Sequence, residues 1–138
     1  MSTKIRKRMQ ASGGGEGGFT LIELLVVIII IGILAAIAIP LYLSQRTRGY
    51  EATAQSDVKN MSMAEETYFA AHNAYGTLAD IEGTDGGYVA SPTVTPSVIS
   101  TDPSGYCLSA VDTRGGNTYY INTKSGSTNT GPTTNPCL

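Results

Sequence analysis

The sequence predicts an α+β protein in which a long N-terminal α-helix packs its second half on a small antiparallel β-sheet, followed by a C-terminal loop. Three observations predict this fold. Residues 24–43 carry no charge, and 18 of these 20 residues are apolar. Beyond them, apolar residues recur at steps of three or four, as they do on one face of a helix. After Gly83 the chain changes to short β-branched and aromatic runs separated by Gly, Ser, Thr, Asn and Pro.

The 138-residue chain has few charged residues and none of the patterns that carry catalysis. Charged residues make up 14% of the sequence and the net charge is −2, so no basic surface for nucleic acid is predicted. Two cysteines are too few for a disulfide-dense scaffold or a four-cysteine zinc site. There is one histidine, His72, and no Gly-x-Ser-x-Gly turn or phosphate-binding loop. The sequence therefore predicts neither an enzyme nor a cofactor.

The apolar run has the charge pattern of an export signal but the length of a membrane span. Four basic residues precede it, and no acid balances them before Glu16: Lys4, Arg6, Lys7 and Arg8. The apolar core of a cleaved signal peptide is about 7–15 residues long. Here 20 residues form about 30 Å of helix, the thickness of the hydrocarbon core of a bilayer. We therefore expect a single span in the cytoplasmic (inner) membrane, with the N-terminus inside the cell.

The residues at the start of this run resemble the processing site of type IV prepilins, in particular of type IVa-like major pilins. The matching residues are Gly17-Gly18-Phe19-Thr20-Leu21-Ile22-Glu23, and the resemblance continues through Pro40 and less strictly to Asn60. It implies that a dedicated prepilin peptidase cuts after Gly18 and that Phe19, the new N-terminal residue, is methylated. Removal of the leader, residues 1–18, takes away four basic residues and one acid, so that the net charge changes from −2 to −5 and 120 residues remain.

Glu23 places a carboxylate at the edge of the predicted span, where an ionised group is costly and usually functional. One interpretation is that it lies at the depth of the lipid headgroups and complements the helix dipole at little cost. The resemblance implies another, in which this acid neutralises the free Phe19 amine of a neighbouring subunit as a filament grows. Opposite charges are tolerated in an apolar core only when they are paired. Glu23 is therefore the predicted registry residue of assembly.

Gly32 and Pro40 are the predicted weak points of the apolar helix. Proline in a helix interior removes one backbone hydrogen bond and clashes with the preceding turn. Membrane helices tolerate both residue types because neighbouring groups satisfy the freed backbone. The resemblance implies in addition that residues 32–40 loosen when the subunit leaves the bilayer and packs into a filament.

The helical pattern continues beyond the membrane segment, and the expected domains follow it. We expect one helix over residues 19–75, ended at Gly76, with a membrane or filament-core half (19–43), an amphipathic half (44–76) and a β head (77–138). The expected core-facing stripe consists of Ala54, Val58, Met61, Ala64, Tyr68, Ala71 and Tyr75.

The last third of the chain has the pattern of a small antiparallel sheet. Three short strands are predicted: 87–91, 106–112 and 117–123. Residues 113–116 are a hairpin turn between the last two, and apolar residues alternate along the middle strand so that one face can rest on the helix. Prolines make residues 91–104 a loop with at most one edge strand, around Val98 and Ile99.

Cys107 and Cys137 are the only cysteines, and both fall in the part predicted to lie outside the membrane. An oxidising compartment favours a disulfide between them over two free thiols, and a metal site is disfavoured because there is only one histidine. The pattern resembles that of pilins in which a disulfide attaches the C-terminal segment to the sheet. Such a bond would close a loop of about 30 residues and contribute about 3–4 kcal/mol.

Other polar residues of the head carry weaker signals. Four acids could contribute to a calcium site in the loops, although scattered surface acids are usually only solvated: Asp80, Glu82, Asp85 and Asp102. Asn60-Met61-Ser62 matches the glycosylation triplet, which is a weak signal on a helix.

The residues and the resemblance together predict a structural subunit of a type IV pilus. The predicted partners are further copies of the chain in a filament, a prepilin peptidase, the pilus assembly platform with its ATPase motor, and the inner membrane. The alternative within the family is a pseudopilin of a type II secretion or DNA-uptake (competence) system, which shares the N-terminal features. A different class, a single-pass anchored binding module, would keep residues 1–18. The role of a pilus in adhesion, twitching motility or DNA uptake depends on its surface loops and its motor.

Overall fold

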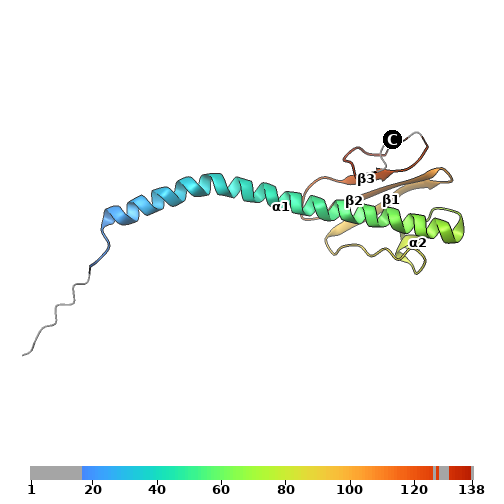
Figure 1. Cartoon of the computed structure of the whole chain (residues 1–138), viewed down its shortest axis with the longest axis horizontal. Coiled ribbons are helices and arrows are strands. Elements are labelled where there is room, and N and C mark those ends of the chain that lie inside the picture. Colours follow the sequence, from blue (N-terminus) through green and yellow to red (C-terminus); the bar gives the residue numbers. More distant parts are fainter. Residues whose placement is uncertain (1–16, 126, 128–130, 138) are drawn as a thin grey trace, which may run out of the picture. The chain divides into compact units, whose positions relative to one another are not determined.

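The computed structural model describes residues 17–125, 127 and 131–137, and Figure 1 shows how its elements are arranged. Residues 1–16, which contain the basic cluster and most of the expected leader, lie outside the described residues. The chain divides into two compact units, 1–38 and 39–138. The elements in chain order are α1 (Leu21–His72), α2 (Leu78–Glu82), β1 (Val94–Asp102), β2 (Gly105–Asp112) and β3 (Tyr119–Asn122).

Helix α1 is slightly shorter at both ends than the expected helix over residues 19–75. It begins at Leu21 because Thr20 and Glu23 form a reciprocal cap, in which each accepts a backbone N–H of the other. It ends at His72 because Asn73 adopts the left-handed conformation, with φ of 55°. Asparagine tolerates this conformation and so can end a helix as glycine does. The expected stop at Gly76 is therefore corrected to Asn73.

The second half of α1 runs along the sheet in the second unit, as expected (Figure 1). Ala54, Val58 and Met61 are fully buried and Ala64 nearly so. The rest of the core comes from α2, the sheet and the segment before it: Ile81, Tyr88, Val94, Tyr106, Leu108, Ala110, Tyr119 and Ile121. Of the other residues of the expected stripe, Tyr68 and Tyr75 pack against this core, whereas Ala71 is exposed at its margin.

The sheet is antiparallel with the strand order β1-β2-β3. β2 and β3 confirm the expected strands at 106–112 and 117–123 and the turn between them, with Leu108 opposite Ile121. The register of β1 on β2 shifts between Val98 and Ser100, which identifies a β-bulge.

The expected strand at 87–91 is wrong. The edge strand allowed around Val98 and Ile99 is present, but as the nine-residue strand β1 it occupies most of the segment predicted to be a loop. The backbone at 87–91 bonds elsewhere, since the N–H of Tyr88 donates to Ile81 O at 2.9 Å and the N–H of Ser91 donates to Asp57 at 2.8 Å. β1 accommodates Pro96 because it is an edge strand, where a residue without an N–H breaks no ladder.

Helix α2 is a five-residue helix that the sequence analysis does not predict. Thr77 starts it, and both its N–H and its hydroxyl donate to Asp80 Oδ2, at 2.7 and 2.6 Å. The spacing of Thr77 and Asp80 is that of a capping box, a signal that is present in the sequence. The helix places Ile81 in the core.

The C-terminal segment is attached to the sheet at two points. Cys107 and Cys137 form a disulfide, with 6.1 Å between their Cα atoms, which confirms the predicted bond. Thr133 pairs with Tyr120 of β3 through two backbone hydrogen bonds of 2.7 and 3.0 Å. Both faces of β2 are consequently buried, with Leu108 in the core and Cys107 on the opposite face. The predicted fold class, a long helix on a small antiparallel sheet with a disulfide-closed C-terminal loop, is confirmed.

Candidate assembly and processing site

The Gly18–Phe19 peptide bond lies in exposed backbone ahead of α1. Residues 17–20 belong to no helix or strand, and the Phe19 side chain is 83% exposed. A Cβ atom added to Gly18 would meet no atom of the described residues within 4 Å. The chain therefore exposes this bond outside any helix or strand.

Glu23 turns its carboxylate back toward the N-terminus of its own chain. Its Oε2 accepts hydrogen bonds from the N–H and the hydroxyl of Thr20, each at 2.8 Å. The carboxylate is thus bonded to the residue that directly follows Phe19 in the sequence. No cation among the described residues pairs with it. The expected cleavage and methylation residues, Gly18 and Phe19, are close to Glu23 in the sequence, and Glu23 contacts the residue that follows Phe19.

The first half of α1 exposes nearly all of its apolar side chains. Leu21, Ile28 and Leu34 are examples, with 80%, 65% and 61% of their surface exposed. By length and composition, α1 contains a segment that could cross a membrane. The helix is unbroken through Gly32 and Pro40, and a Cβ at Gly32 would meet nothing within 4 Å. Gly32 thus has open space beside it among the described residues, and Pro40 is exposed.

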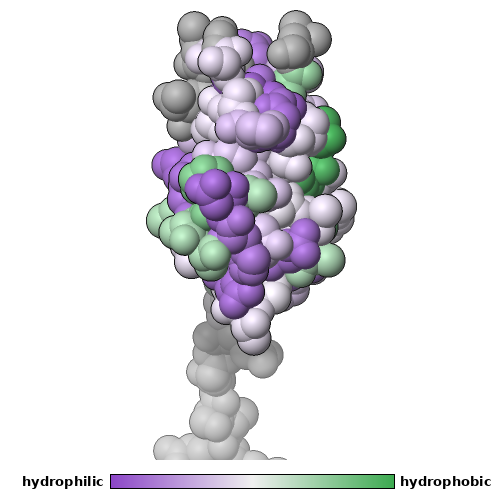
Figure 2. Space-filling model, turned by 90° about the vertical axis from the view of Figure 1, so that its right-hand side faces the viewer, coloured by the Kyte–Doolittle hydropathy of each residue, from purple (hydrophilic) through white to green (hydrophobic). Residues whose placement is uncertain are grey.

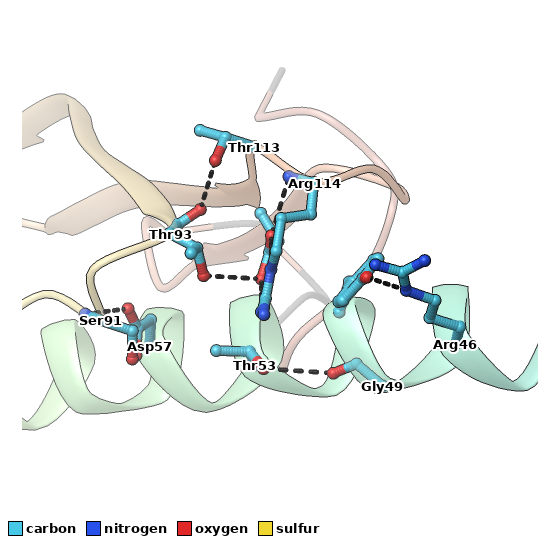
Figure 3. A network of polar contacts seen from close by, with 10 residues as sticks. Arg46, Gly49, Thr53, Asp57, Ser91, Thr93, Thr113 and Arg114 are labelled. Atoms are coloured by element: carbon cyan, nitrogen blue, oxygen red, sulfur yellow. Dashed lines mark hydrogen bonds and ion pairs between the residues drawn. The ribbon is translucent and has the colours of Figure 1, made fainter.

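A polar network connects the turn after β2 to α1 where the head begins (Figure 3). Arg114 binds Asp112 through Nη2–Oδ2 and Nε–Oδ1 contacts of 2.6 and 2.9 Å, and its guanidinium lies 4.3 Å from the centre of the Tyr50 ring. Thr93 also donates to Asp112, at 3.1 Å. The bonds from Arg114 hold the pKa of Asp112 well below its usual range. The network fixes β1, the β2–β3 turn and the helix to one another.

Asp57 fixes the connection that leads into β1 (Figure 3). It is 2% exposed, and its two oxygens accept the N–H and the hydroxyl of Ser91 at 2.8 and 2.9 Å. The Tyr88 hydroxyl lies 3.5 Å away, and burial together with the nearby carboxylate raises the pKa of Tyr88. The sequence analysis does not identify Asp57 as buried.

Glu65 is the second buried acid of α1, with no exposed surface. Its Oε2 accepts the N–H of Gly76 at 2.9 Å, whereas Oε1 has no hydrogen-bond partner among the described residues. Burial raises the pKa of this carboxyl, and the nearby Asp80 and Glu66 act in the same direction. The helical period contains a signal for both buried acids, because Asp57 and Glu65 fall three or four residues from buried apolar positions.

Replacing Glu65 with glutamine is expected to stabilise the head at high pH. Because its pKa is raised, the folded state binds the proton more tightly than the unfolded chain. The contribution of Glu65 is therefore full below the unfolded pKa of about 4.3 and is lost as the pH rises through the folded pKa. Glu65→Gln should raise the Tm by a few degrees at about pH 8, a gain on the order of 1 kcal/mol, and leave it unchanged at about pH 4.

Thermal melts of the detergent-solubilised chain at both pH values measure this effect. Glu82→Gln is the matched control, since Glu82 is an exposed acid on α2 and should change neither melt. An equal Tm for the Glu65→Gln variant and the wild type at both pH values would contradict a buried, proton-binding role for Glu65.

The four acids considered as calcium ligands do not converge. Asp80 caps α2, Asp85 lies 3.4 Å from His72, and Asp102 forms an ion pair of 2.7 Å with Lys124. The bond from Lys124 lowers the pKa of Asp102 to about 2. Within the described residues, no group of three or more possible ligands is close enough to hold a metal ion.

The residues of the glycosylation triplet lie on α1. Asn60 is exposed, and the Ser62 hydroxyl is hydrogen-bonded to the Tyr106 hydroxyl at 2.6 Å. Burial raises the pKa of Tyr106 to about 12, so the phenol stays protonated and can donate in this pair. Ser62 therefore has a packing role between the helix and β2.

Comparisons with known proteins place this geometry in a family. Residues 14–39 match the model of the prokaryotic N-terminal methylation motif. The chain is 37% identical over 94 residues to the type IV wide pilus major component PilA4 of Thermus thermophilus, covering 67% of this chain and 71% of that protein. It is 33% identical over 106 residues to the type II secretion system core protein G of Aeromonas hydrophila, covering 77% of this chain and 72% of that protein.

A third relative aligns over a shorter stretch. The type IV major pilin protein PilA of Myxococcus xanthus is 41% identical over 63 residues, which is 46% of this chain and 29% of the relative. The similarity to this protein therefore spans less than a third of its length.

The capped apolar helix and the disulfide-closed α+β head define an N-terminally anchored subunit. The identity and coverage of these matches are high enough to assign the family: the chain belongs to the type IV pilin family. Because these relatives are pilins and secretion-system core proteins rather than enzymes, the chain is a structural, non-enzymatic protein.

Proposed function

We propose that this chain is a prepilin that is cut between Gly18 and Phe19 and then polymerises into a type IV pilus through its apolar helix. One observation carries the proposal. An exposed Gly18–Phe19 bond directly precedes a capped helix whose apolar side chains are almost all uncovered. In the mature chain, we assign residues 19–43 to the membrane and then to the filament core, 44–76 to the amphipathic half of the helix and 77–138 to the head.

The membrane stage follows from the charges that flank the apolar segment. The four basic residues of the leader favour a cytoplasmic N-terminus, so the head would face the outside of the inner membrane. Most backbone groups of the apolar run are satisfied in lipid because they bond within α1, and Pro40 removes one of these hydrogen bonds. Prepilin peptidase, the assembly platform and its ATPase motor are the partners that this route requires.

The filament stage depends on more than apolar contact. A helix that moves from lipid into a filament exchanges one apolar environment for another, so the hydrophobic effect contributes little. Charge pairing and close packing must then direct assembly. The Glu23 carboxylate and the backbone amine that cleavage creates at Phe19 are opposite charges at the same exposed end of α1, which supports a pair between neighbouring copies. Loosening at Gly32 and Pro40 would let the helix adapt to its neighbours.

Replacing Gly18 with valine is expected to prevent processing without disturbing the fold. Among the described residues, a Cβ at this position meets no atom within 4 Å. A defect would therefore reflect cleavage by the peptidase and not the folding of the head. We expect immunoblots to show only the uncut chain and no filaments in the sheared surface fraction. Gly17→Val is the matched control, because Gly17 is equally uncovered but lies one residue from the cut. Normal cutting of the Gly18→Val chain would contradict the proposed site.

The alternative function is that of a pseudopilin in a secretion machine. The similarity to type II secretion system core protein G over 77% of this chain favours it, whereas the major pilin relatives and the disulfide-closed C-terminal segment favour a pilus. Deleting the gene for this chain separates the two. Loss of surface filaments with normal protein secretion supports the pilus, and loss of secretion with intact pili supports the alternative.

A further inference from the structure

Arginines gather where α1 leaves its apolar segment, and the role proposed for them below rests on the membrane stage of the proposed function. The apolar run ends at Leu43, and Arg46 and Arg48 follow three and five residues later, both exposed. At 1.5 Å per residue, they lie about 4.5 and 7.5 Å beyond the run. The headgroup layer of a bilayer extends about 5–8 Å beyond the hydrocarbon core on each side. Both arginines therefore fall at headgroup depth when the run spans a bilayer.

Tyr50 brings a third arginine into this group. The Nε of Arg46 donates to the Tyr50 hydroxyl, and the Arg46 guanidinium lies 5.5 Å from the centre of the Tyr50 ring. The guanidinium of Arg114 lies 4.3 Å from the same ring. Figure 3 shows that Arg46 comes from the helix and Arg114 from the turn after β2. An aromatic ring attracts each cation, but it does not neutralise their charges.

Only part of this positive charge is balanced within the described residues. Asp112 pairs with Arg114 at 2.6 Å, whereas neither Arg46 nor Arg48 forms an ion pair with another described residue. Glu51, the residue after Tyr50, is hydrogen-bonded to the β2–β3 turn at 2.8 Å. The arginines at this end of the head outnumber these two acids, so positive charge predominates here.

The acids of the head gather at its other end. Helix α1 rises about 39 Å from Arg46 to its last residue, His72. In Figure 2, which looks onto the end of the head where α1 ends, strongly hydrophilic residues form a continuous band. An anionic surface would attract the basic end and repel the acidic one. The acids on the last turns of α1 or close to its end are Glu65, Glu66, Asp80, Asp85 and Asp102.

The preferred topology of a membrane span does not explain Arg46 and Arg48. Basic residues next to a span favour the cytoplasmic side, whereas the proposed orientation places these two on the opposite side. An arginine side chain presents its N–H groups in a planar fork that matches the oxygens of a phosphate group. The anchored helix keeps both side chains at headgroup depth, so the phosphates of the bilayer are the anions that they meet first.

We propose that Arg46, Arg48 and Arg114 bind the phosphate groups of anionic phospholipids in the bilayer that holds the apolar segment. Arg46 and Arg48 enter the headgroup layer from the helix. Arg114, held by Tyr50 and Asp112, extends the contact to the β2–β3 turn. The contact holds the basic end of the head against the membrane until the subunit leaves the bilayer.

Hydrogen exchange of single copies in nanodiscs tests this contact in the full chain. Discs of phosphatidylcholine alone are compared with discs of equal parts phosphatidylcholine and phosphatidylglycerol. Each basic group near an anionic surface favours contact about fivefold, so the amides of residues 113–117 should exchange at least about fivefold more slowly with phosphatidylglycerol. About 1 M salt, which shortens the Debye length to about 3 Å, should remove the difference. The leader is the same in every sample and lies on the opposite face of the disc.

Charge-removing variants identify the residues responsible. Arg46→Gln/Arg48→Gln should abolish the effect of phosphatidylglycerol and leave the Tm of the head unchanged, because both side chains are exposed. Arg48→Gln alone should weaken the effect. Lys59→Gln is its matched control, since Lys59 is also an exposed cation of α1 but lies about 24 Å beyond the apolar run. This control should keep the full effect.

Three results would overturn the proposal: equal exchange in the two kinds of disc, slow exchange that persists in the double variant, or protection of residues 113–117 in filaments but not in discs. The last result would assign the arginines to a neighbouring copy. The disc experiment requires neither cleavage nor filaments, so its failure leaves the proposed pilus function standing. A wild-type strain without filaments of this chain would overturn that function and leave the result in discs unchanged.

Discussion

Glu23→Ala is expected to leave processing intact and to abolish filament assembly. The cut bond lies five residues upstream of Glu23 in exposed backbone, so the peptidase should still act. In assembly, however, the Phe19 amine of the neighbouring copy would enter an apolar core without a partner. An unpaired charge in a membrane-like interior costs about 3 kcal/mol. Since about 1.4 kcal/mol corresponds to a tenfold change in an equilibrium constant, the filament yield should fall by more than tenfold. Immunoblots of cells and of the sheared fraction measure processing and assembly separately.

Glu23→Gln separates the charge of this residue from its cap. Glutamine at this position still accepts the N–H of Thr20, as in a capping box, but it carries no charge. Loss of the cap alone costs about 1 kcal/mol at one end of a 52-residue helix, which such a helix tolerates. We therefore expect Glu23→Gln to fail in assembly as Glu23→Ala does. Wild-type filament yields from the glutamine variant would show that Glu23 acts only as a cap.

Removing the disulfide is expected to have the largest effect on the stability of the head. Cys107 and Cys137 are 30 residues apart in the sequence, and closing a loop of this length contributes about 3–4 kcal/mol in the chain-entropy model. For a domain of about 100 residues, this corresponds to a fall in Tm of about 15 °C. The described part of this segment, residues 131–137, pairs with the sheet at a single isolated bridge, from Thr133 to Tyr120, so we expect it to compensate little.

The double variant Cys107→Ala/Cys137→Ala measures this contribution without a reducing agent. Its melt should match that of the reduced wild type, and reductant should not shift it further. We expect it to lose protection of the C-terminal segment from proteases before the sheet unfolds. A Tm within about 2 °C of the oxidised wild type would contradict a structural role for the bond.

The sequence predicts the helix and the β2–β3 hairpin well because their signals are local. Apolar residues at helical spacing define α1, and short β-rich runs with Gly115 and Gly116 at the turn define the hairpin; both glycines adopt positive φ. β1 is predicted only in part, because Pro96 and its neighbours indicate a loop with at most one edge strand around Val98 and Ile99. Only the position of this strand at the sheet edge makes proline acceptable, and strand order is a property of the whole fold.

The polar residues that join the parts of the head are harder to predict. Asp57 and Glu65 fall within the apolar stripe, but an acid in a stripe is normally assigned to its margin, and their partners Ser91 and Gly76 are 34 and 11 residues away. The polar residues at the N-terminus are easier to predict. The Gly18-Phe19 motif, Glu23 and the capping-box spacing of Thr20 and Glu23 are all visible in the sequence, and the structure adds the hydrogen bonds of this cap.

Mass spectrometry of sheared surface filaments tests the central proposal most directly. The account predicts a mature chain of 120 residues that begins at methylated Phe19 and contains the bond between Cys107 and Cys137. Glu23 is then the first acid of the mature chain. A surface protein that keeps residues 1–18 would contradict processing and polymerisation together, and would identify the chain as an anchored module instead.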